Sequence, residues 1–376
     1  MSDYYAYRRV PVLLRGKAAT MVGKPGVWNW DDVNPGTAAL IDVIEVRPDD
    51  AVLDLGCGTG LIGLAAARLA AEGQVTLVDA HVAAVACARQ TLAANEVANA
   101  DVQLADGAVA VEEYDLVLSH LPRGRAVVEG LIQGAVAALR PSGRLYIVAH
   151  KRAGVKSAIA CAARLLGQAG VVRQKQGYHV ALAVKKQTQT LAASQESQFK
   201  IVLDGVPTTL VSRPGVFAWD RLDDGTAALI HAMEIQPGEN VLDLGCGAGL
   251  LALAAARRGG QAVAVDADLR AVESARHTLA ANGVAGEALM SDCAQAVLER
   301  RFDVVLCNPP FHQGVGVAYD VARQMLRDAA AVLRPGGRFY LVSNAFIRYE
   351  REVGGCFTRF KELFDDRRYR VLQATR

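Results

Sequence analysis

Val241-Leu242-Asp243-Leu244-Gly245-Cys246-Gly247-Ala248-Gly249 is the stretch that decides how this chain folds. Its apolar first half predicts a short buried strand, and the run Leu250–Arg258 after it predicts a helix. The alternating glycines predict a tight turn whose backbone can approach a ligand closely. The first turn of the helix offers unpaired N–H groups, and open parallel sheets bind ligands at this end of their strands. The stretch therefore predicts a ligand-binding turn in an α/β fold.

Much of the chain occurs twice. Val52–Gly58 is repeated with identical letters as Val241–Gly247, 189 residues later. Shorter segments repeat at similar offsets: Pro25–Trp28 with Pro214–Phe217, Gly36–Ile41 with Gly225–Ile230, and Thr91–Asn95 with Thr278–Asn282. A unit of this length is a whole domain, because solenoid repeats are far shorter. We therefore predict two copies of one domain, residues 1–187 and 199–376, joined by a polar linker at 188–198.

Both copies show the same order of predicted elements. A hairpin comes first, at Val10–Val22 in the first copy and at Phe199–Ser212 in the second. A helix then starts at the Gly-Thr pair, and short apolar strands alternate with helices. In the second copy these strands are Val241–Leu244, Ala262–Asp266, Ala288–Ser291, Asp303–Cys307 and Phe339–Ser343. The alternation predicts an α/β fold with a mostly parallel, Rossmann-like sheet and helices on both faces, to which Tyr369–Ala374 adds an antiparallel strand.

Three aspartates lie at successive strand ends of the second copy. Asp243 precedes the first glycine of the turn by two residues, Asp266 ends the next strand, and Asp292 follows the third. The glycine spacing is Gly-x-Gly-x-Gly, unlike the Gly-x-Gly-x-x-Gly of nicotinamide and flavin folds. Three carboxylates suit a cationic ligand with a ribose and an adenine better than they suit a pyrophosphate. The alternative is a tight strand–helix turn with incidental surface acids, yet the same set recurs in the first copy.

The sequence Val-Leu-Asp-Leu-Gly-Cys-Gly-x-Gly resembles the first motif of class I S-adenosylmethionine-dependent methyltransferases. The resemblance implies two tandem domains of this class, each built on a seven-stranded sheet. It also implies roles: the turn and Asp243 face the methionine part of the cofactor, Asp266 the ribose and Asp292 the adenine amine. The implied cofactor contacts are Asp243, Gly245, Gly247, Gly249, Asp266, Asp292 and Asn308. Their counterparts in the first copy are Asp54, Gly56, Gly58, Gly60, Asp79 and Asp106.

A second motif, Asn308-Pro309-Pro310-Phe311-His312, follows the fourth strand of the second copy. Two prolines make a rigid turn. The side-chain oxygen of Asn308 and a neighbouring backbone carbonyl can accept two hydrogen bonds from one planar amine, and Phe311 can stack on the ring that carries it. Such a clamp aims the amine nitrogen at a methyl sulfonium, so catalysis is mostly positioning. We assign catalysis to Asn308, Pro309 and Phe311 and a substrate contact to His312; a rigid loop without chemistry is the alternative.

The first copy lacks this clamp. It has Ser119-His120-Leu121-Pro122-Arg123 at the aligned place, and Ser119 cannot offer the acceptor geometry of Asn308. This division is similar to that of the tandem-domain ribosomal RNA guanine-N2 methyltransferases of bacteria, a resemblance that covers nearly the whole chain. It implies methyl transfer to N2 of a guanine in 16S rRNA by the second copy, and a degenerate, structural or RNA-binding first copy. The first copy departs from that family by keeping its glycines and acids, which leaves its cofactor binding open.

Basic residues are placed unevenly along the chain. Ten of them lie between positions 140 and 186, and no acidic residue lies between 130 and 195. Such a patch suits contacts with phosphates, which position a nucleic acid without specifying its sequence. We assign this role to Lys151, Arg152 and Lys156; an ordinary solvated helix face is the alternative.

Composition excludes several classes of protein. The 376 residues are 52% hydrophobic and 21% charged, which excludes a largely disordered chain, and the net charge of +2 excludes a strongly polybasic one. No apolar run reaches the roughly 18–20 residues of a membrane span, and the N-terminus lacks the apolar core of a secretory signal. The seven cysteines have no metal-ligand spacing. We expect a cytoplasmic monomer without metal or membrane, with S-adenosylmethionine as cofactor and ribosomal RNA or the small ribosomal subunit as partner.

Two other functions stay open at this point. Similar Asn-Pro-Pro-Phe motifs occur in release-factor glutamine methyltransferases, so the motif indicates an sp² amine acceptor more firmly than an RNA. The basic stretch of the first copy favours RNA over a protein substrate. A non-catalytic RNA-binding or ribosome assembly factor is the third hypothesis, and the intact Asn308 motif argues against it.

Overall fold

The computed structural model describes residues 3–107, 111–186, 196–310 and 316–376. Contacts between residues divide the chain into an N-terminal unit, Met1–Gln195, and a C-terminal unit, Glu196–Arg376. The division falls inside the predicted linker 188–198, of which residues 188–195 lie outside the described part. Ser197 and Gln198 correct its end, because they already pair in the first strand of the C-terminal unit.

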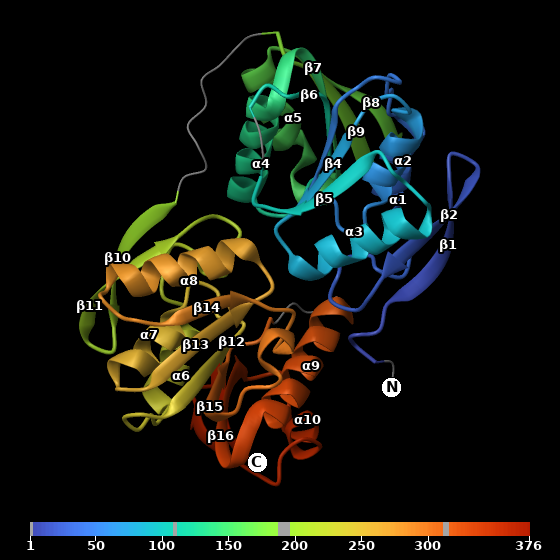
Figure 1. Ribbon diagram of the computed structural model, residues 1–376. Coiled ribbons are helices and arrows are strands. Elements are labelled where there is room, and N and C mark those ends of the chain that lie inside the picture. Colours follow the sequence, from blue (N-terminus) through green and yellow to red (C-terminus); the bar gives the residue numbers. More distant parts are fainter. Residues whose placement is uncertain (1–2, 108–110, 187–195, 311–315) are drawn as a thin grey trace. The chain divides into compact units, whose positions relative to one another are not determined.

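The N-terminal unit combines a separate hairpin with a seven-stranded sheet of order β5-β4-β3-β6-β7-β9-β8 (Figure 1). Its strands are β1 Arg8–Leu14, β2 Lys17–Gly23, β3 Val52–Leu55, β4 Val75–Asp79, β5 Ala100–Leu104, β6 Tyr114–His120, β7 Leu139–His150, β8 Ala169–Lys175 and β9 Tyr178–Val184. Its helices are α1 Pro35–Val43, α2 Leu61–Leu69, α3 Val82–Ala94, α4 Arg125–Ala138, η1 Lys151–Ala153 and α5 Val155–Leu166. Neighbouring strands from β5 to β7 are parallel, and β9 and β8 add the antiparallel edge.

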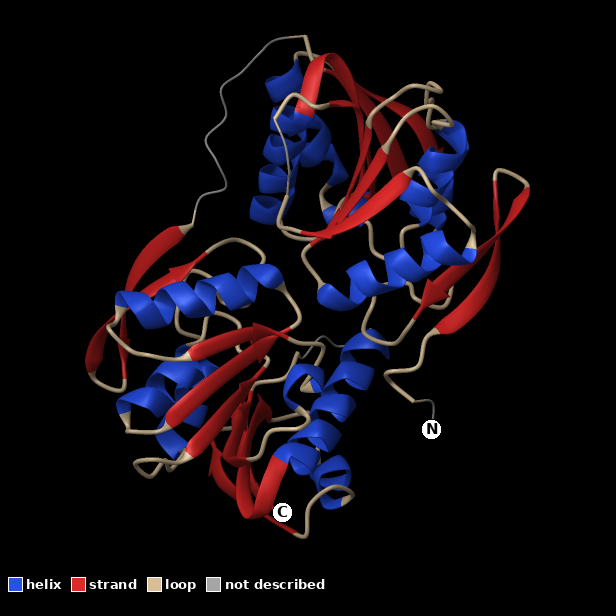
Figure 2. Ribbon diagram, in the orientation of Figure 1, coloured by secondary structure: helices blue, strands red, loops and turns tan. Residues whose placement is uncertain are grey.

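The C-terminal unit repeats this plan with the sheet order β14-β13-β12-β15-β16-β18-β17. Its strands are β10 Ser197–Leu203, β11 Val206–Ser212, β12 Asn240–Leu244, β13 Gln261–Asp266, β14 Glu287–Met290, β15 Phe302–Cys307, β16 Leu333–Asn344, β17 Arg359–Asp365 and β18 Tyr369–Thr375. Its helices are α6 Asp224–Ala232, α7 Leu250–Arg257, α8 Leu269–Ala281, η2 Gln295–Val297, α9 Gly316–Val332 and α10 Glu350–Gly354. Figure 2 shows helices on both faces of the sheet, as the alternating pattern predicts.

Apolar side chains fill both faces of each sheet. In the N-terminal unit the helices α1 to α3 contribute to one buried cluster, and α4 and α5 contribute to a second on the other face. The central strand β3 is buried along its whole length, which explains why it reads as a continuous apolar run. Its aspartate, Asp54, is the exception to that run and is also fully buried.

The repeated Thr-Leu-Ala-Ala-Asn segment attaches each hairpin to its unit. In the N-terminal unit Thr91 Oγ1 accepts from the Val22 N–H at 2.9 Å, and Asn95 bonds both backbone groups of Thr20. Thr278 and Asn282 repeat these bonds on β11, at 3.1 Å from the Val211 N–H and through both backbone groups of Thr209. These side chains form hydrogen bonds with backbone groups of β2 and β11 that do not pair with the other strand of the hairpin.

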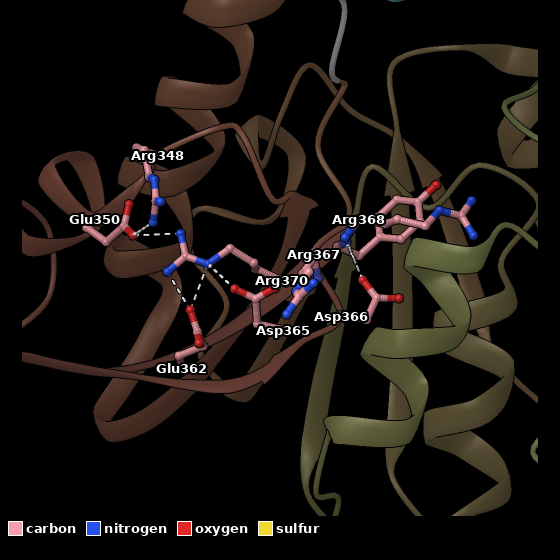
Figure 3. Close-up of polar contacts among 9 residues, drawn as sticks. Arg348, Glu350, Glu362, Asp365, Asp366, Arg367, Arg368 and Arg370 are labelled. Atoms are coloured by element: carbon pink, nitrogen blue, oxygen red, sulfur yellow. Dashed lines mark hydrogen bonds and ion pairs between the residues drawn. The ribbon is translucent and has the colours of Figure 1, made fainter.

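An arginine joins the last strand of the C-terminal unit to its neighbours (Figure 3). The guanidinium of Arg370 donates to Glu350 of α10 and to Glu362 of β17, both at 2.7 Å, and lies 3.5 Å from Asp365. Arg370 is buried, so its charge depends on these partners. Burial opposes ionisation of Glu350, but the hydrogen bond from Arg370 holds the pKa of that carboxyl below its ordinary value.

Replacing Arg370 by methionine is expected to destabilise the C-terminal unit by about 1–3 kcal/mol at neutral pH, because Glu362 and Asp365 lose this cation and Glu350 is left with the exposed Arg348. A lowered carboxyl pKa stabilises the fold above the unfolded pKa and loses this effect as pH falls through the folded pKa. The difference from wild type should therefore shrink between about pH 7 and about pH 3.5 in thermal unfolding. Arg367→Met, at the neighbouring exposed turn, is the control. A pH-independent difference would contradict the ionic role.

Candidate functional site

The glycine turn of the C-terminal unit continues the pairing of two strands beyond their ends. After Leu244, the N–H groups of Gly245 and Cys246 both donate to the Val265 carbonyl, at 2.9 and 3.0 Å. Gly247 N–H then donates to Asp266 Oδ2 at 3.0 Å. The three glycines have φ values of +79°, +52° and +78°, which L side chains rarely adopt, so this path requires glycine.

Asp243 is fully buried beneath this turn. Its Oδ2 accepts from the Ala252 N–H in the first turns of α7 at 3.0 Å, whereas Oδ1 accepts no hydrogen bond from any described residue. Burial raises the pKa of Asp243 to about 7; the Ala252 N–H lowers it and the nearby Asp266 carboxylate raises it further. A buried carboxylate with a vacant oxygen is suited to a cationic partner.

The other two predicted acids lie at the neighbouring strand ends. Asp266 ends β13, and its Oδ1 accepts from the Asp268 N–H at 3.0 Å. Asp292 follows β14 and is buried, and the adjacent Ser291 N–H donates to the Asp266 carbonyl at 2.8 Å. Because β12, β13 and β14 are consecutive in the sheet, Asp243, Asp266 and Asp292 gather along one edge, as the sequence predicts.

Asn308 lies at the end of β15, on the other side of β12. Its Nδ2 donates to Thr226 Oγ1 at 3.0 Å and to Asp223 Oδ2 at 3.3 Å. A carboxylate only accepts, so the amide nitrogen must face Asp223 and the side-chain oxygen must point away from it. Pro309 after it is buried. Phe311 and His312 lie outside the described residues.

Asp223 and Thr226 were not among the predicted site residues. Asp223 caps α6 by accepting from the Thr226 N–H at 2.9 Å, so the helix start and the amide orientation share one carboxylate. The Gly-Thr pair repeats in both halves, and this repeat is the sequence signal that could have pointed to them.

The N-terminal counterpart of Asn308 is His120, which corrects the sequence alignment on Ser119. Parallel pairing places Leu118 beside Asp54 and Leu306 beside Asp243, so the second residue after each leucine corresponds. His120 Nδ1 lies 3.0 Å from Thr37 Oγ1, the counterpart of Thr226.

Aromatic rings enclose this histidine. Trp28 and Tyr178 meet the His120 ring edge to face at centroid distances of 4.8 and 5.7 Å. Burial lowers the pKa of His120 to about 4, so the imidazole is neutral at physiological pH. At the position that corresponds to Asn308, the N-terminal unit therefore carries a neutral imidazole instead of an amide.

The basic residues of the N-terminal unit, predicted to form one surface, are not all exposed. Lys151 and Arg152 in η1 and Lys156 in α5 are exposed, and no ion pair to their side chains is found within the described part of the chain. Lys185, from the same basic stretch, is buried and lies 3.2 Å from Glu112. The exposed residues follow the end of β7, at the same edge of the sheet as the glycine turn.

Across the described ranges no group of three or more His, Cys, Asp or Glu side chains could hold a metal ion, and no helix there is long and apolar enough to cross a bilayer. The cysteines are free thiols. Burial raises the pKa of the Cys246 and Cys307 thiols well above the ordinary value, so both are neutral packing groups.

Comparison with known proteins identifies the family. The model of the methyltransferase small domain matches residues 18–182 and, a second time, residues 207–373. The chain belongs to the methyltransferase small-domain family. This methyltransferase is similar to a protein named ribosomal RNA small subunit methyltransferase C from Chromohalobacter salexigens, with 39% identity over 260 residues that span 68% of this chain and 76% of that one. A protein of the same name from Pseudomonas putida is 35% identical over 271 residues, which span 70% and 80% of the two chains.

A solved structure matches this methyltransferase along nearly its whole length. It is the 16S rRNA guanine-N2 methyltransferase of T. thermophilus in complex with AdoMet and guanosine, with a TM-score of 0.87, 34% identity and 98% of each chain covered. The tandem fold and the tandem-domain methyltransferase family expected from the sequence are confirmed.

Asp243→Asn should change the pH dependence of stability. The folded pKa of about 7 lies above the ordinary 3.8, so the folded state holds a proton that the unfolded chain loses, and stability falls as pH rises between these values. Asparagine keeps an acceptor for Ala252 and removes the charge. From about pH 5 to about pH 8 the variant should gain about 1–3 kcal/mol relative to wild type in thermal unfolding. A stability difference that does not change with pH would contradict the buried charge.

Proposed function

We propose that this methyltransferase transfers a methyl group from S-adenosylmethionine to the exocyclic N2 amine of a guanine in small-subunit ribosomal RNA. The observation that carries the proposal is the orientation of Asn308. Its amide nitrogen is engaged by Thr226 and Asp223, which leaves the oxygen for an amine that approaches the edge where Asp243 and Asp266 lie. The names of the relatives, and the guanosine and AdoMet in the similar solved structure, support the same substrate and cofactor.

The residues of the glycine turn fit such a cofactor. Gly247 has an open face, because a Cβ built on it would meet no atom nearer than a Val216 methyl carbon at 4.0 Å. The vacant Oδ1 of Asp243 would accept from an ammonium group, and Asp266 at the end of β13 would accept from ribose hydroxyls. When bound, the cofactor supplies an electrophilic methyl group on a sulfonium.

Positioning of the amine is the chemistry that this chain contributes. Asn308 Oδ1 and a backbone carbonyl of the Pro309 turn would each accept one N–H of the guanine amine, which directs the nitrogen lone pair out of the clamp. Held in this way, the nitrogen lone pair would face the methyl group that the bound cofactor supplies, and the proton that the amine loses on methylation would leave to solvent. No strong base is required, and correct placement of two reactants can account for a large part of the rate.

Access to the clamp requires an unstacked base. A guanine amine inside a duplex cannot reach the end of a buried strand, so the nucleotide must be single-stranded or flipped out. Phe311, which the sequence assigns to stacking on the base, and His312 stay predictions in this role.

The N-terminal unit would supply contacts to RNA phosphates. Lys151, Arg152 and Lys156 are exposed at one sheet edge, which supports a surface there that binds the phosphates of the RNA backbone. A degenerate, RNA-binding role for this unit, a cytoplasmic location and a monomeric state belong to the same proposal and rest on the sequence.

Asn308→Ala should lower kcat for methyl transfer to ribosomal RNA by about 100-fold or more while the affinity for S-adenosylmethionine changes less than about threefold. Asn308 holds the acceptor, and the other implied cofactor contacts stay in place, so the chemical step suffers far more than cofactor binding. Single-turnover transfer of tritiated methyl and calorimetric binding measure the two effects.

Two variants control this experiment. His120→Asn alters the matching position of the other unit and should leave kcat unchanged. Asp266→Ala should weaken cofactor binding instead. Near-wild-type turnover in Asn308→Ala would refute the assigned site.

Reversing the charge of Lys151, Arg152 and Lys156 to Glu should weaken RNA binding and reduce the slope of log affinity against log salt by about 2, because up to three phosphate contacts are lost. Cofactor affinity should stay the same. Filter binding across a salt series measures the slope. Equal charge reversal at the exposed Lys200, Arg359 and Lys361 is the matched control. An equal loss in both triple variants would contradict a specific surface.

A further inference from the structure

The N-terminal unit holds a second glycine turn with the same backbone bonds. Gly56 and Cys57 N–H donate to the Val78 carbonyl at 2.9 and 3.0 Å, and Gly60 N–H donates to the Cys57 carbonyl at 2.8 Å. The corresponding bonds of the C-terminal turn measure 2.9, 3.0 and 2.8 Å. Loss of the amine clamp has therefore left the turn itself unaltered.

The acids around the second turn are held as in the first. Asp79 at the end of β4 accepts from the Gly58 N–H at 3.0 Å and from the His81 N–H at 2.9 Å. Asp54 Oδ2 accepts from the Gly63 N–H at 2.7 Å. The carboxylate of Asp79 therefore lies against the turn as that of Asp266 does.

Two glycines of this turn face space that is open among the described residues. A Cβ built on Gly56 or Gly58 would meet no described atom within 4 Å. In the C-terminal turn, a Cβ on Gly245 would come within 2.6 Å of the Met325 methyl carbon. By this measure the N-terminal turn is at least as open to a ligand as the one assigned to the cofactor.

Asp54 carries an oxygen that the fold does not use. It is fully buried, and its Oδ1 accepts no hydrogen bond from any residue of the described ranges. Burial raises its pKa to about 7, the Gly63 N–H lowers it, and Asp79 raises it further. A vacant carboxylate oxygen buried beside a second carboxylate is costly without a cationic partner.

We propose that the N-terminal unit binds an adenosylated sulfur amino acid, either the cofactor or its demethylated product, and transfers no methyl group. The ligand class rests on the proposed function of the C-terminal unit. Asp79 would accept from ribose hydroxyls and Asp54 Oδ1 from the ligand ammonium, while His120 replaces the amide that would orient an amine. Cofactor contacts and acceptor contacts come from different strand ends, so one set can be lost while the other stays.

A purely structural role explains part of this turn but not all of it. Gly60 is needed for folding, because a Cβ there would come within 3.0 Å of the Ala88 backbone. The positive φ values of Gly56 and Gly58, +80° and +55°, also favour glycine for the turn itself. Neither reason accounts for Asp54, since asparagine would keep the bond to Gly63 without placing a titratable group where burial opposes its ionisation.

Calorimetric titration of the full-length protein with S-adenosylhomocysteine, which cannot be turned over, tests the proposal. Two molecules should bind per chain in wild type, one in Asp79→Arg, one in Asp266→Arg and none in the double variant. Asp101→Arg makes the same charge change on the exposed surface of the same unit and should keep both sites. A single wild-type site that persists in Asp79→Arg and disappears in Asp266→Arg overturns the proposal and leaves the proposed function standing. Absence of any binding overturns both.

A second measurement guards against misfolding of the Asp79 variant. In Asp266→Arg, whose N-terminal unit is unaltered, S-adenosylhomocysteine should slow hydrogen exchange of the Gly56–Gly60 amides by about tenfold or more. Asp79→Asn, which keeps the acceptor for Gly58, should weaken this protection. Unchanged exchange in Asp266→Arg at saturating ligand overturns the proposal.

Discussion

The hydrogen bond from a backbone N–H of the glycine turn to the aspartate that ends the next strand is the constraint on which each unit depends. The Gly247 bond to Asp266 and the Gly58 bond to Asp79 have the same length, 3.0 Å. Each bond joins the turn to a side chain of the neighbouring strand, just beyond the backbone bonds to the Val265 and Val78 carbonyls that continue the strand pairing. It also holds a carboxylate at the ligand edge; burial is the main cause of the raised pKa of the aspartate one strand away, and this charge raises that pKa further.

Adjacent strands place different parts of the proposed site. The strands β12 to β14 place carboxylates and glycines, whereas β15 places the Asn308 amide, to which we assign the acceptor. The N-terminal unit keeps the first arrangement and replaces the second by His120, a neutral imidazole between Trp28 and Tyr178. A duplicated sheet can therefore change the residue at one strand end while the neighbouring strand end keeps its hydrogen bonds.

Strand positions, both glycine turns and the edge that collects the acids follow from the sequence, because apolar runs, glycine spacing and an internal repeat are local patterns. The register at the end of β6 does not follow from local pattern. Ser119 and His120 are both polar, and the pairing of Leu118 with Asp54 is what decides between them. The burial of Lys185 does not follow from local pattern either. Its ammonium donates to Glu112 and to the Leu139 carbonyl, which belong to distant parts of the sequence.

Asp223 takes part in two contacts at once, so the orientation of Asn308 depends on the local stability of α6. The same carboxylate oxygen caps α6 through Thr226 and orients Asn308. Fraying of the first turn of α6 therefore releases the amide before the sheet is affected. Helix ends open more readily than buried strands, so under the proposed function activity is lost at a lower temperature than that at which the domain melts. The thermal tolerance of the proposed activity is then set at a helix terminus and not in the core.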